Sequence, residues 1–223
     1  MQFPKTSTNS LLIIAVSMNV MIHVADSSHS QYAQPICDLV YLSAQARGTG
    51  IAKRSTEYIE EKMESGKAVI ALDGDTLVGF SYIETWGHRK FVANSGLIVN
   101  PDYRGMGFAR KIKHRIFELS RKLYPNAKIF SITTGLAVMK MNTELGFKPV
   151  TFSELTDDKE FWKGCQGCRN YDILQRNDYK MCLCTGLLHD PKSKEPAPAV
   201  AKTFARKVVK PIVKVKKPNK FKK

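Results

Sequence analysis

Residues 100–111, NPDYRGMGFARK, place Gly105 and Gly107 two positions apart, between Arg104 and a run of basic residues. The apolar pattern before the glycines is typical of a strand, and the pattern after them is typical of an amphipathic helix. The first N–H groups of a helix have no partner within it, and the helix dipole is positive there, so such a turn binds anions. Glycine lets the backbone approach the anion closely, while Arg104 and Arg110 would add charge. The segment predicts a phosphate-binding turn.

Two better-known phosphate motifs do not match this turn. A dinucleotide fingerprint needs a third glycine at a fixed spacing, and a nucleoside-triphosphate loop ends in Gly-Lys-Ser or Gly-Lys-Thr. Neither is present in residues 100–111. On its own, the Gly-x-Gly pair therefore leaves open the simpler interpretation of a glycine turn without a ligand.

A second set of reactive side chains lies near the end of the chain, where the five cysteines are mostly gathered. Cys165 and Cys168 form a CxxC pair, and Cys182 and Cys184 form a CxC pair after thirteen intervening residues. Four thiols in two close pairs are consistent with a tetrahedral structural zinc site. Free or redox-active thiols are the alternative, and the CxC spacing is less usual for zinc than CxxC.

These side chains must be positioned by elements that the hydrophobic pattern predicts in alternation along the chain. The expected strands are residues 19–26, 67–72, 76–86, 90–100, 127–134 and 148–152, with residues 169–175 as a further candidate. The expected helices are residues 28–46, 55–66, 107–123 and 135–146. In the third helix, Ile112 and Ile116 belong to the apolar stripe and Lys113 to the basic face opposite it. This order predicts an α/β fold with a mixed central sheet and helices on both faces.

The two ends of the chain differ in composition from the middle. From Lys192 onward there are 12 Lys and Arg residues against the single acid Glu195, so most of the net charge of +15 lies in the tail. A lysine- and proline-rich tail with little periodicity is typical of disorder, and it could contact polyanions nonspecifically or merely solubilise the protein. The apolar run at residues 11–24 could pass for a secretory signal, but we prefer a first strand preceded by a loose leader. An odd number of cysteines and the lack of an apolar run of about 20 residues favour a cytoplasmic protein without a membrane span.

The segment GLIVNPDYRGMGFA, residues 96–109, resembles the pyrophosphate-binding motif of the GNAT superfamily, the GCN5-related N-acetyltransferases. That motif is an apolar strand, x-Pro-x-Tyr-Arg, and then Arg/Gln-x-x-Gly-x-Gly/Ala, which Arg104, Gly107 and Ala109 match. ELGF at residues 144–147 matches the end of the family's second motif. The order of elements also agrees, and the resemblance covers roughly residues 18–152.

The resemblance implies a GNAT-like fold and acetyl-CoA or another acyl-CoA as the co-substrate. The strand before the turn would splay from its neighbour and bind the pantetheine arm, and the turn amides would hold the pyrophosphate. Carried onto this chain, the cofactor-binding residues are Leu97, Ile98, Val99, Arg104, Gly105, Met106, Gly107, Phe108, Ala109, Arg110, Thr134 and Asn142. Asn142 stands where many relatives have a tyrosine that protonates the departing thiolate, which an asparagine cannot do. Thr134 would either bind the cofactor or cap the helix that follows it.

The acceptor side is predicted less directly. The segment ETWGHRK, residues 84–90, lies near where the family binds its acceptor, and Glu84 is the candidate catalytic base. A solvent-facing strand glutamate is the competing interpretation. The candidate substrate-binding residues are Arg47, Trp86, His88 and Arg89.

We therefore expect an acyl-CoA-dependent N-acyltransferase acting on a primary amine, with a small amino-acid-like acceptor such as glutamate. The alternatives are acetylation of a protein lysine or N-terminus, and a non-catalytic module that binds acyl-CoA or polyanions. The expected organisation is a leader at residues 1–17, the acyltransferase domain at 18–152, a Cys-containing extension at 153–190 packed on it, and the basic tail at 191–223. A homodimer stays open.

Overall fold

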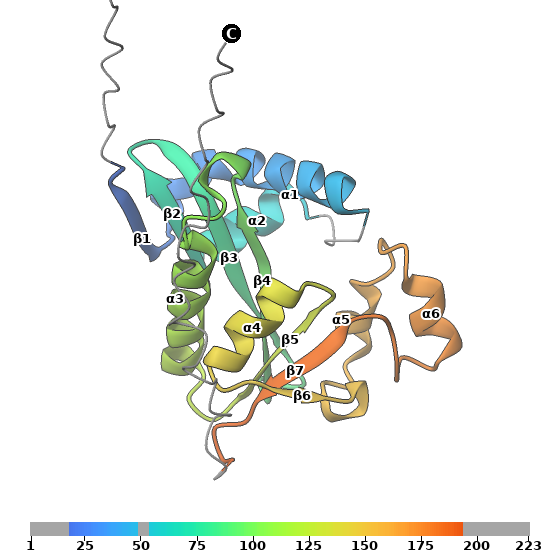
Figure 1. Cartoon of the computed structure of the whole chain (residues 1–223). Helices are drawn as coiled ribbons and strands as arrows, with labels where there is room; N and C mark the ends of the chain where they lie inside the picture. Colours follow the sequence, from blue (N-terminus) through green and yellow to red (C-terminus); the bar gives the residue numbers. More distant parts are fainter. Residues whose placement is uncertain (1–17, 49–53, 194–223) are drawn as a thin grey trace, which may run out of the picture.

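The computed structural model describes residues 18–48 and 54–193 (Figure 1). The expected leader, most of the basic tail and the Arg47 side chain lie outside the described residues. The predictions made for them stay predictions.

A seven-stranded mixed sheet forms the centre of the protein, in the order β1-β2-β3-β4-β5-β7-β6. Neighbouring strands are antiparallel except for β4 and β5, which are parallel. The strands are β1 Val20–Val24, β2 Ala68–Asp73, β3 Thr76–Trp86, β4 Phe91–Val99, β5 Lys128–Thr133, β6 Lys148–Val150 and β7 Thr185–His189. The expected α/β architecture is confirmed.

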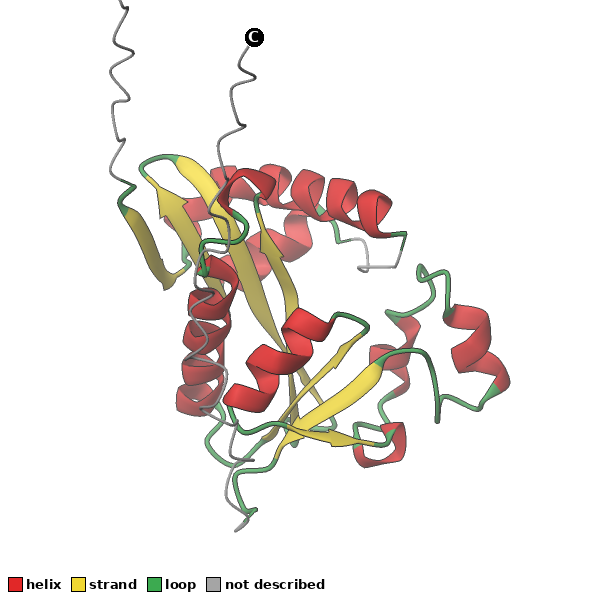
Figure 2. Ribbon diagram, viewed as in Figure 1, coloured by secondary structure: helices red, strands yellow, loops and turns green. Residues whose placement is uncertain are grey.

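Helices cover both faces of this sheet (Figure 2). They are α1 Ala33–Arg47, α2 Thr56–Glu64, α3 Phe108–Leu123, α4 Leu136–Glu144, α5 Lys159–Lys163 and α6 Tyr171–Arg176, with 3-10 turns at Ser27–Tyr32, Pro101–Tyr103 and Phe152–Glu154. Because successive strand residues point to opposite faces, Val69 packs into the core beneath α3 while Ile70 packs into the core beneath α1 and α2. None of the described helices is both long and apolar enough to cross a membrane.

Local sequence signals account for most of these elements. Gly74 adopts φ +57° in the turn between β2 and β3, as the DGD sequence predicts. The Ser55 hydroxyl caps α2 by accepting a hydrogen bond from the Tyr58 N–H. Residues 20–24 pair with β2, so the first strand is confirmed.

The parallel pair β4–β5 is short, and this opens the sheet. Only Phe91, Val92 and Ala93 of β4 have partners in β5, although β4 continues to Val99. Beyond Ala93 the two strands diverge, which leaves backbone groups of β4 without a strand partner on that side. The splay implied by the family resemblance is therefore present.

Three sequence expectations are wrong. Residues 169–175 were a candidate strand, but Tyr171–Arg176 form the helix α6, with Asn170 as its N-cap. A strand was not expected at 185–189, yet β7 pairs with both β5 and β6, so the sheet extends past the expected domain boundary at residue 152. Lys113, expected on the basic face of its helix, is 2% exposed. Its Nζ donates a 3.1 Å hydrogen bond to Asn94 Oδ1 of β4, which offsets part of the cost of burial.

Candidate functional site

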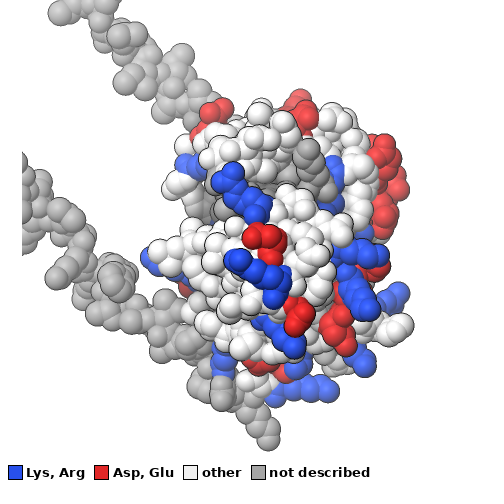
Figure 3. Space-filling view, turned by 90° about the vertical axis from the view of Figure 1, so that its right-hand side faces the viewer, with Lys and Arg blue, Asp and Glu red and all other residues white. Residues whose placement is uncertain are grey.

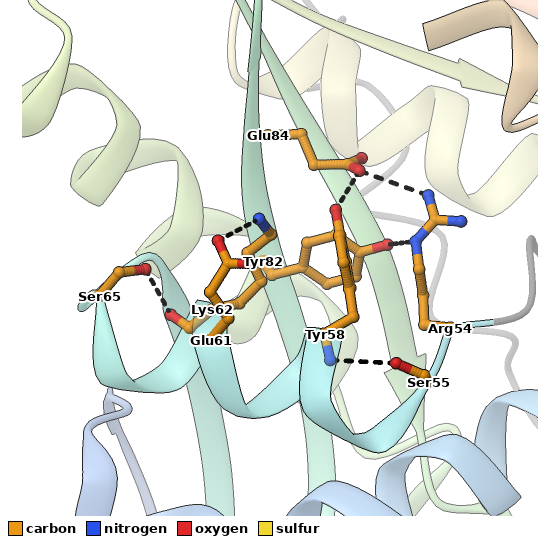
Figure 4. Close-up of polar contacts among 8 residues, drawn as sticks. All are labelled: Arg54, Ser55, Tyr58, Glu61, Lys62, Ser65, Tyr82 and Glu84. Atoms are coloured by element: carbon orange, nitrogen blue, oxygen red, sulfur yellow. Dashed lines mark hydrogen bonds and ion pairs between the residues drawn. The ribbon is translucent and has the colours of Figure 1, made fainter. Parts of the chain in front are cut away.

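Glu84 of β3 lies in a partly buried polar cluster with Arg54 and Tyr58 at the start of α2 (Figure 4). Ser95 of β4 completes the contacts of its carboxylate. One carboxylate oxygen accepts a hydrogen bond from the Tyr58 hydroxyl and lies 3.4 Å from Arg54 Nη2. The other oxygen accepts from Ser95 Oγ at 2.5 Å. Three donors hold both oxygens of this carboxylate in place. The interpretation of Glu84 as a solvent-facing glutamate is wrong, because it is 8% exposed.

Two tyrosines and an arginine complete this cluster. Arg54 Nε donates a 2.9 Å hydrogen bond to the Tyr82 hydroxyl, and its guanidinium lies 5.1 Å from the centre of the Tyr58 ring. Burial and then the neighbouring Glu84 carboxylate raise the pKa of Tyr58 well above its usual range, and the pKa of Tyr82 is raised by the same two causes. Both phenols therefore stay protonated at neutral pH. Tyr58 can pass a proton to Glu84 but cannot itself serve as the ionised base.

Gly96 lets β4 pass close to this cluster. It adopts φ +64°, and a Cβ atom built there would lie 2.2 Å from the Tyr82 ring. A larger residue would displace Tyr82 and, through it, Arg54. The pairing of β3 with β4 shifts register just here, between Phe80 and Tyr82.

The turn between β4 and α3 has the conformation that its glycines predict. Gly105 and Gly107 adopt φ +79° and +85°, and Gly107 is the residue that precedes α3. A Cβ atom at either glycine would meet no atom within 4 Å, so the positive φ angles, not crowding, require glycine. The α3 cap has no side-chain hydrogen bond, which leaves the first N–H groups of α3 for an anion.

The arginines of this turn are placed differently from one another. Arg104 Nε donates to the Val99 carbonyl at 3.1 Å, and its Nη2 donates to Ser43 Oγ of α1 at 3.1 Å. Arg104 thus ties the turn to β4 and α1. Arg110 is exposed and pairs with Glu144 of α4 at 2.9 Å, which links the N-terminal turn of α3 to α4.

The remaining cofactor candidates lie on β4 and directly after β5. Ile98 and Val99 are buried, whereas Leu97 is only partly buried on the unpaired part of β4. Thr134 is exposed after β5 and caps no helix, because the N-cap of α4 is Gly135 and no side chain caps this helix. The Gly135 N–H donates to Thr133 Oγ1 instead. The capping alternative for Thr134 is therefore wrong.

Asn142 of α4 is fully buried, and neither its side-chain nitrogen nor its side-chain oxygen has a partner among the described residues. An unsatisfied buried amide costs about 1–3 kcal/mol, so a group bound beside it would be stabilising. The open glycine turn, the unpaired edge of β4 and this orphaned amide all suit a phosphorylated, amide-rich ligand such as coenzyme A.

The predicted acceptor residues of the β3–β4 hairpin lie beside the Cys-containing extension rather than in the Glu84 cluster. Trp86 packs against Phe161 of α5, with ring centres 5.6 Å apart. The neighbouring Gly87 N–H donates to Asp158. His88 and Arg89 are exposed in the turn that follows.

The extension also reaches the start of α2. A Cβ atom at Gly164 would lie 3.9 Å from Arg54 Nη2, and one at Gly48 would lie 3.1 Å from Arg169 Nη1. The extension therefore forms one wall beside the Glu84 cluster. On this side of the protein, Lys and Arg are interspersed with Asp and Glu, with no large surface of one sign (Figure 3).

All four cysteines of the extension are brought together. Cys165, Cys168, Cys182 and Cys184 line one small cavity of about 20 Å³. Within residues 18–48 and 54–193, no group of three or more His, Cys, Asp or Glu side chains is arranged as a ready metal site. Cys37 is the fifth cysteine, on α1, where its Sγ donates to the Arg54 carbonyl.

Sequence reasoning found Glu84 but missed Arg54, Tyr58, Tyr82 and Ser95. Tyr82 and Glu84 are two positions apart on one strand, so they share a face, and this signal was readable. Tyr58 follows the Ser55 cap by one helical turn, which fixes its height on α2 but not its direction. Arg54 and Ser95 carry no local signal, because only the packing of α2 on the sheet brings them to Glu84.

The comparisons with known proteins concern mainly the middle of the chain. The family model described as "Acetyltransferase (GNAT) family" matches residues 60–147. No curated protein sequence matches the chain.

Solved structures share the fold at low identity. An N-acetylglutamate synthase from Neisseria gonorrhoeae, complexed with coenzyme A and N-acetyl-glutamate, is 18% identical with a TM-score of 0.56, over 79% of this chain and 36% of that one. Rv2747 from Mycobacterium tuberculosis, in complex with CoA and NLQ, is 16% identical with a TM-score of 0.54, over 76% and 98%. YncA from Salmonella typhimurium, with its cofactor acetyl-CoA, is 16% identical with a TM-score of 0.53, over 82% and 99%. The chain thus spans only 36% and 34% of the two N. gonorrhoeae synthase chains it matches.

Proposed function

Because residues 60–147 match the family model of the GNAT acetyltransferases, we propose that the protein moves an acetyl or similar acyl group from coenzyme A to a primary amine. The observation that carries the proposal is the pair of features at the end of β4. There the strand parts from β5 after Ala93, and the glycine turn presents the first N–H groups of α3.

The donor side would bind coenzyme A mainly through backbone groups. The amides from Arg104 to Ala109 would hold the pyrophosphate, and the unpaired edge of β4 near Leu97 would bind the pantetheine arm. The side-chain amide of Asn142 is available for the cofactor where relatives have a tyrosine. Because Asn142 cannot donate an acidic proton, the thiolate would leave without a proton from this position.

On the acceptor side, the Glu84 cluster would receive the proton that the attacking amine loses. The amine nitrogen forms a bond to the acyl carbon, the carbon–sulfur bond breaks, and the electron pair leaves on the coenzyme A sulfur. The amine proton passes to Glu84, either directly or through Tyr58, whose hydroxyl already donates to the carboxylate. Ser95 and Arg54 keep the carboxylate in place for this transfer.

For the acceptor itself we propose a small amino-acid-like amine, with glutamate as one candidate. The support is the cationic Arg54 beside Glu84 and the wall that the extension forms there, because a carboxylate-bearing amine needs a nearby cation. A protein lysine or N-terminus would need an open groove on this side.

The test is the release of coenzyme A thiol with a panel of amino acids, polyamines and peptides. We expect a carboxylate-bearing amine to accelerate release most, Glu84→Gln to reduce the rate, and Arg104→Ala to weaken acetyl-CoA binding by loosening the turn. A peptide preferred over all amino acids would overturn the small-acceptor proposal. Acetyl-CoA binding without acceleration by any amine would instead support the non-catalytic alternative that Asn142 raises.

A further inference from the structure

The four cysteines of the extension converge although they come from two separate segments. Cys165 and Cys168 lie between α5 and α6, and Cys182 and Cys184 lie in the connection that leads into β7. All four line the same cavity of about 20 Å³. The proposed transfer reaction uses none of them, so a different role must account for the convergence.

Apart from the four cysteines, the cavity is lined mostly by apolar side chains, so it suits an ion held by sulfur better than a polar ligand. Ile132, Phe152 and Leu174 supply apolar side chains, and no Asp, Glu or His lines the cavity. The Asn170 N–H donates to Cys168 Sγ at 3.5 Å. Cys182 Sγ lies 3.7 Å from the Asn170 carbonyl, so one residue joins both cysteine pairs.

The segment that carries the cysteines has little regular structure of its own. Its helices α5 and α6 span only 5 and 6 residues, and their packing relies on a small cluster around Trp162 and Leu174. Short elements with so small a core are commonly held by a metal or by disulfides. Here a crosslink between residues 165–168 and 182–184 would hold the extension against β5 and beside Arg54.

We propose that Cys165, Cys168, Cys182 and Cys184 bind one structural zinc ion. Four thiolates in a tetrahedral set select zinc or an iron–sulfur cluster, and a cavity of about 20 Å³ has room for a single ion. The thiols do not yet form a ready ligand set within the described residues, so binding requires their side chains to turn toward the cavity centre. Each turns about its single χ1 bond, and ligation releases the thiol protons.

The test measures metal in the full-length protein, purified without chelator and dialysed against metal-free buffer. We expect about one zinc per chain in the wild type, which is the stoichiometry of a four-thiolate site. Cys165→Ser and Cys182→Ser should each lower zinc at least tenfold. The matched control, Cys37→Ser, removes a thiol that lies outside the cavity and should leave zinc unchanged.

A second measurement needs no variant, so it holds even where a substitution prevents folding. After zinc removal, added cobalt(II) should give intense thiolate-to-cobalt charge-transfer absorption, and zinc should displace it. A chelator should also lower the melting temperature of the zinc-bound protein by several degrees.

The proposal is overturned by substoichiometric zinc in the freshly purified wild type, by a full equivalent of another metal, or by no effect of chelator on melting. A disulfide between the two pairs, seen by mass spectrometry without reductant, would overturn it in favour of a redox role. Metal content and melting do not depend on acyl transfer, so failure here is separable from failure of the proposed function.

Discussion

The donor side and the acceptor side of the candidate site are built in different ways. The proposed donor side is one continuous segment, residues 97–110, which would bind coenzyme A through backbone groups whose geometry two glycines set. The proposed acceptor side is a convergence of side chains from β3, β4, α2 and the residues just before α2 around Glu84, with the extension beside Arg54. Recognition by backbone groups depends on residues that are neighbours in the sequence, so the sequence alone predicts it. A cluster of converging side chains depends on how elements distant in the sequence pack together.

The range that the family model matches covers the donor side but only part of the acceptor side. Residues 60–147 contain the whole donor segment and Glu84, but Arg54, Tyr58 and the extension lie outside the matched range. The shared part of the chain therefore supports the cofactor class. We propose that Arg54, Tyr58 and the extension, which lie outside the matched range, determine which acceptor binds.

Removing the base should give the largest effect, confined to the acceptor side. Glu84→Gln keeps the size of the side chain but loses the proton acceptor, so we expect kcat to fall about 100-fold or more. Acetyl-CoA affinity, measured by calorimetry, should stay within about twofold because Glu84 is not part of the donor segment. Glu61→Gln on the exposed face of α2 is the control. Activity of Glu84→Gln within threefold of the wild type would exclude Glu84 as the base.

A substitution in the glycine turn before α3 should instead weaken acetyl-CoA binding on the donor side. Gly107→Val forces a β-branched residue to φ +85°, so the turn should relax and acetyl-CoA should bind about tenfold or more weakly. Gly74→Val is a matched control, since Gly74 also has a positive φ and open space around it but lies in the β2–β3 turn. Equal losses of acetyl-CoA affinity in both variants would show a general effect of strain instead of a cofactor site.

The close approach of β4 to the Glu84 cluster can be tested at Gly96. In Gly96→Ala the new methyl group collides with the Tyr82 ring, and we expect a loss of about 2–3 kcal/mol in the free energy of unfolding. Gly66→Ala has a similar φ without any neighbour, so it should cost only about 1 kcal/mol from backbone strain. Urea unfolding measures both. Equal costs would mean that the Tyr82 ring does not crowd a side chain at position 96.

Lys113 should make the stability of the protein depend on pH, with no direct effect on either side of the candidate site. Burial lowers its pKa from 10.5 to about 7, so between these values the unfolded chain holds a proton that the folded chain releases. Stability should therefore rise as the pH rises from about 7 toward 10.5, and be insensitive to this group below about 7. Lys113→Met should flatten that rise in urea unfolding, whereas the exposed Lys122→Met should leave it unchanged. A rise that persists in Lys113→Met would assign the pH dependence to another group.

The sequence predicted most of the fold because the first six strands and four longer helices carry their own periodicity and turn residues. It missed β7, a five-residue strand that exists only through pairing with β5 and β6. It misplaced Lys113, since helical position alone does not reveal a buried acceptor such as Asn94. Packing, not propensity, decided both cases.

The residues of the candidate site also fall into two groups, those with a local sequence signal and those placed by packing. Gly105 and Gly107 were predictable because a positive φ at a strand–helix junction leaves a local signature. Glu84 was found through its place in the hairpin, but its partners Arg54 and Ser95 were not. Their approach to Glu84 depends on the register of β3 with β4 and on the seating of α2.

The central claim, acyl transfer from coenzyme A to an amine, can be tested most directly by following the acyl group itself. Acetyl-CoA labelled with ¹³C in the acetyl group is incubated with the wild type or Glu84→Gln and with equal concentrations of candidate amines, and the products are identified by mass spectrometry. We predict one labelled N-acetyl product from a carboxylate-bearing amine, formed by the wild type and strongly reduced in Glu84→Gln. Tight binding of acetyl-CoA with no labelled amine above the protein-free rate would contradict the account.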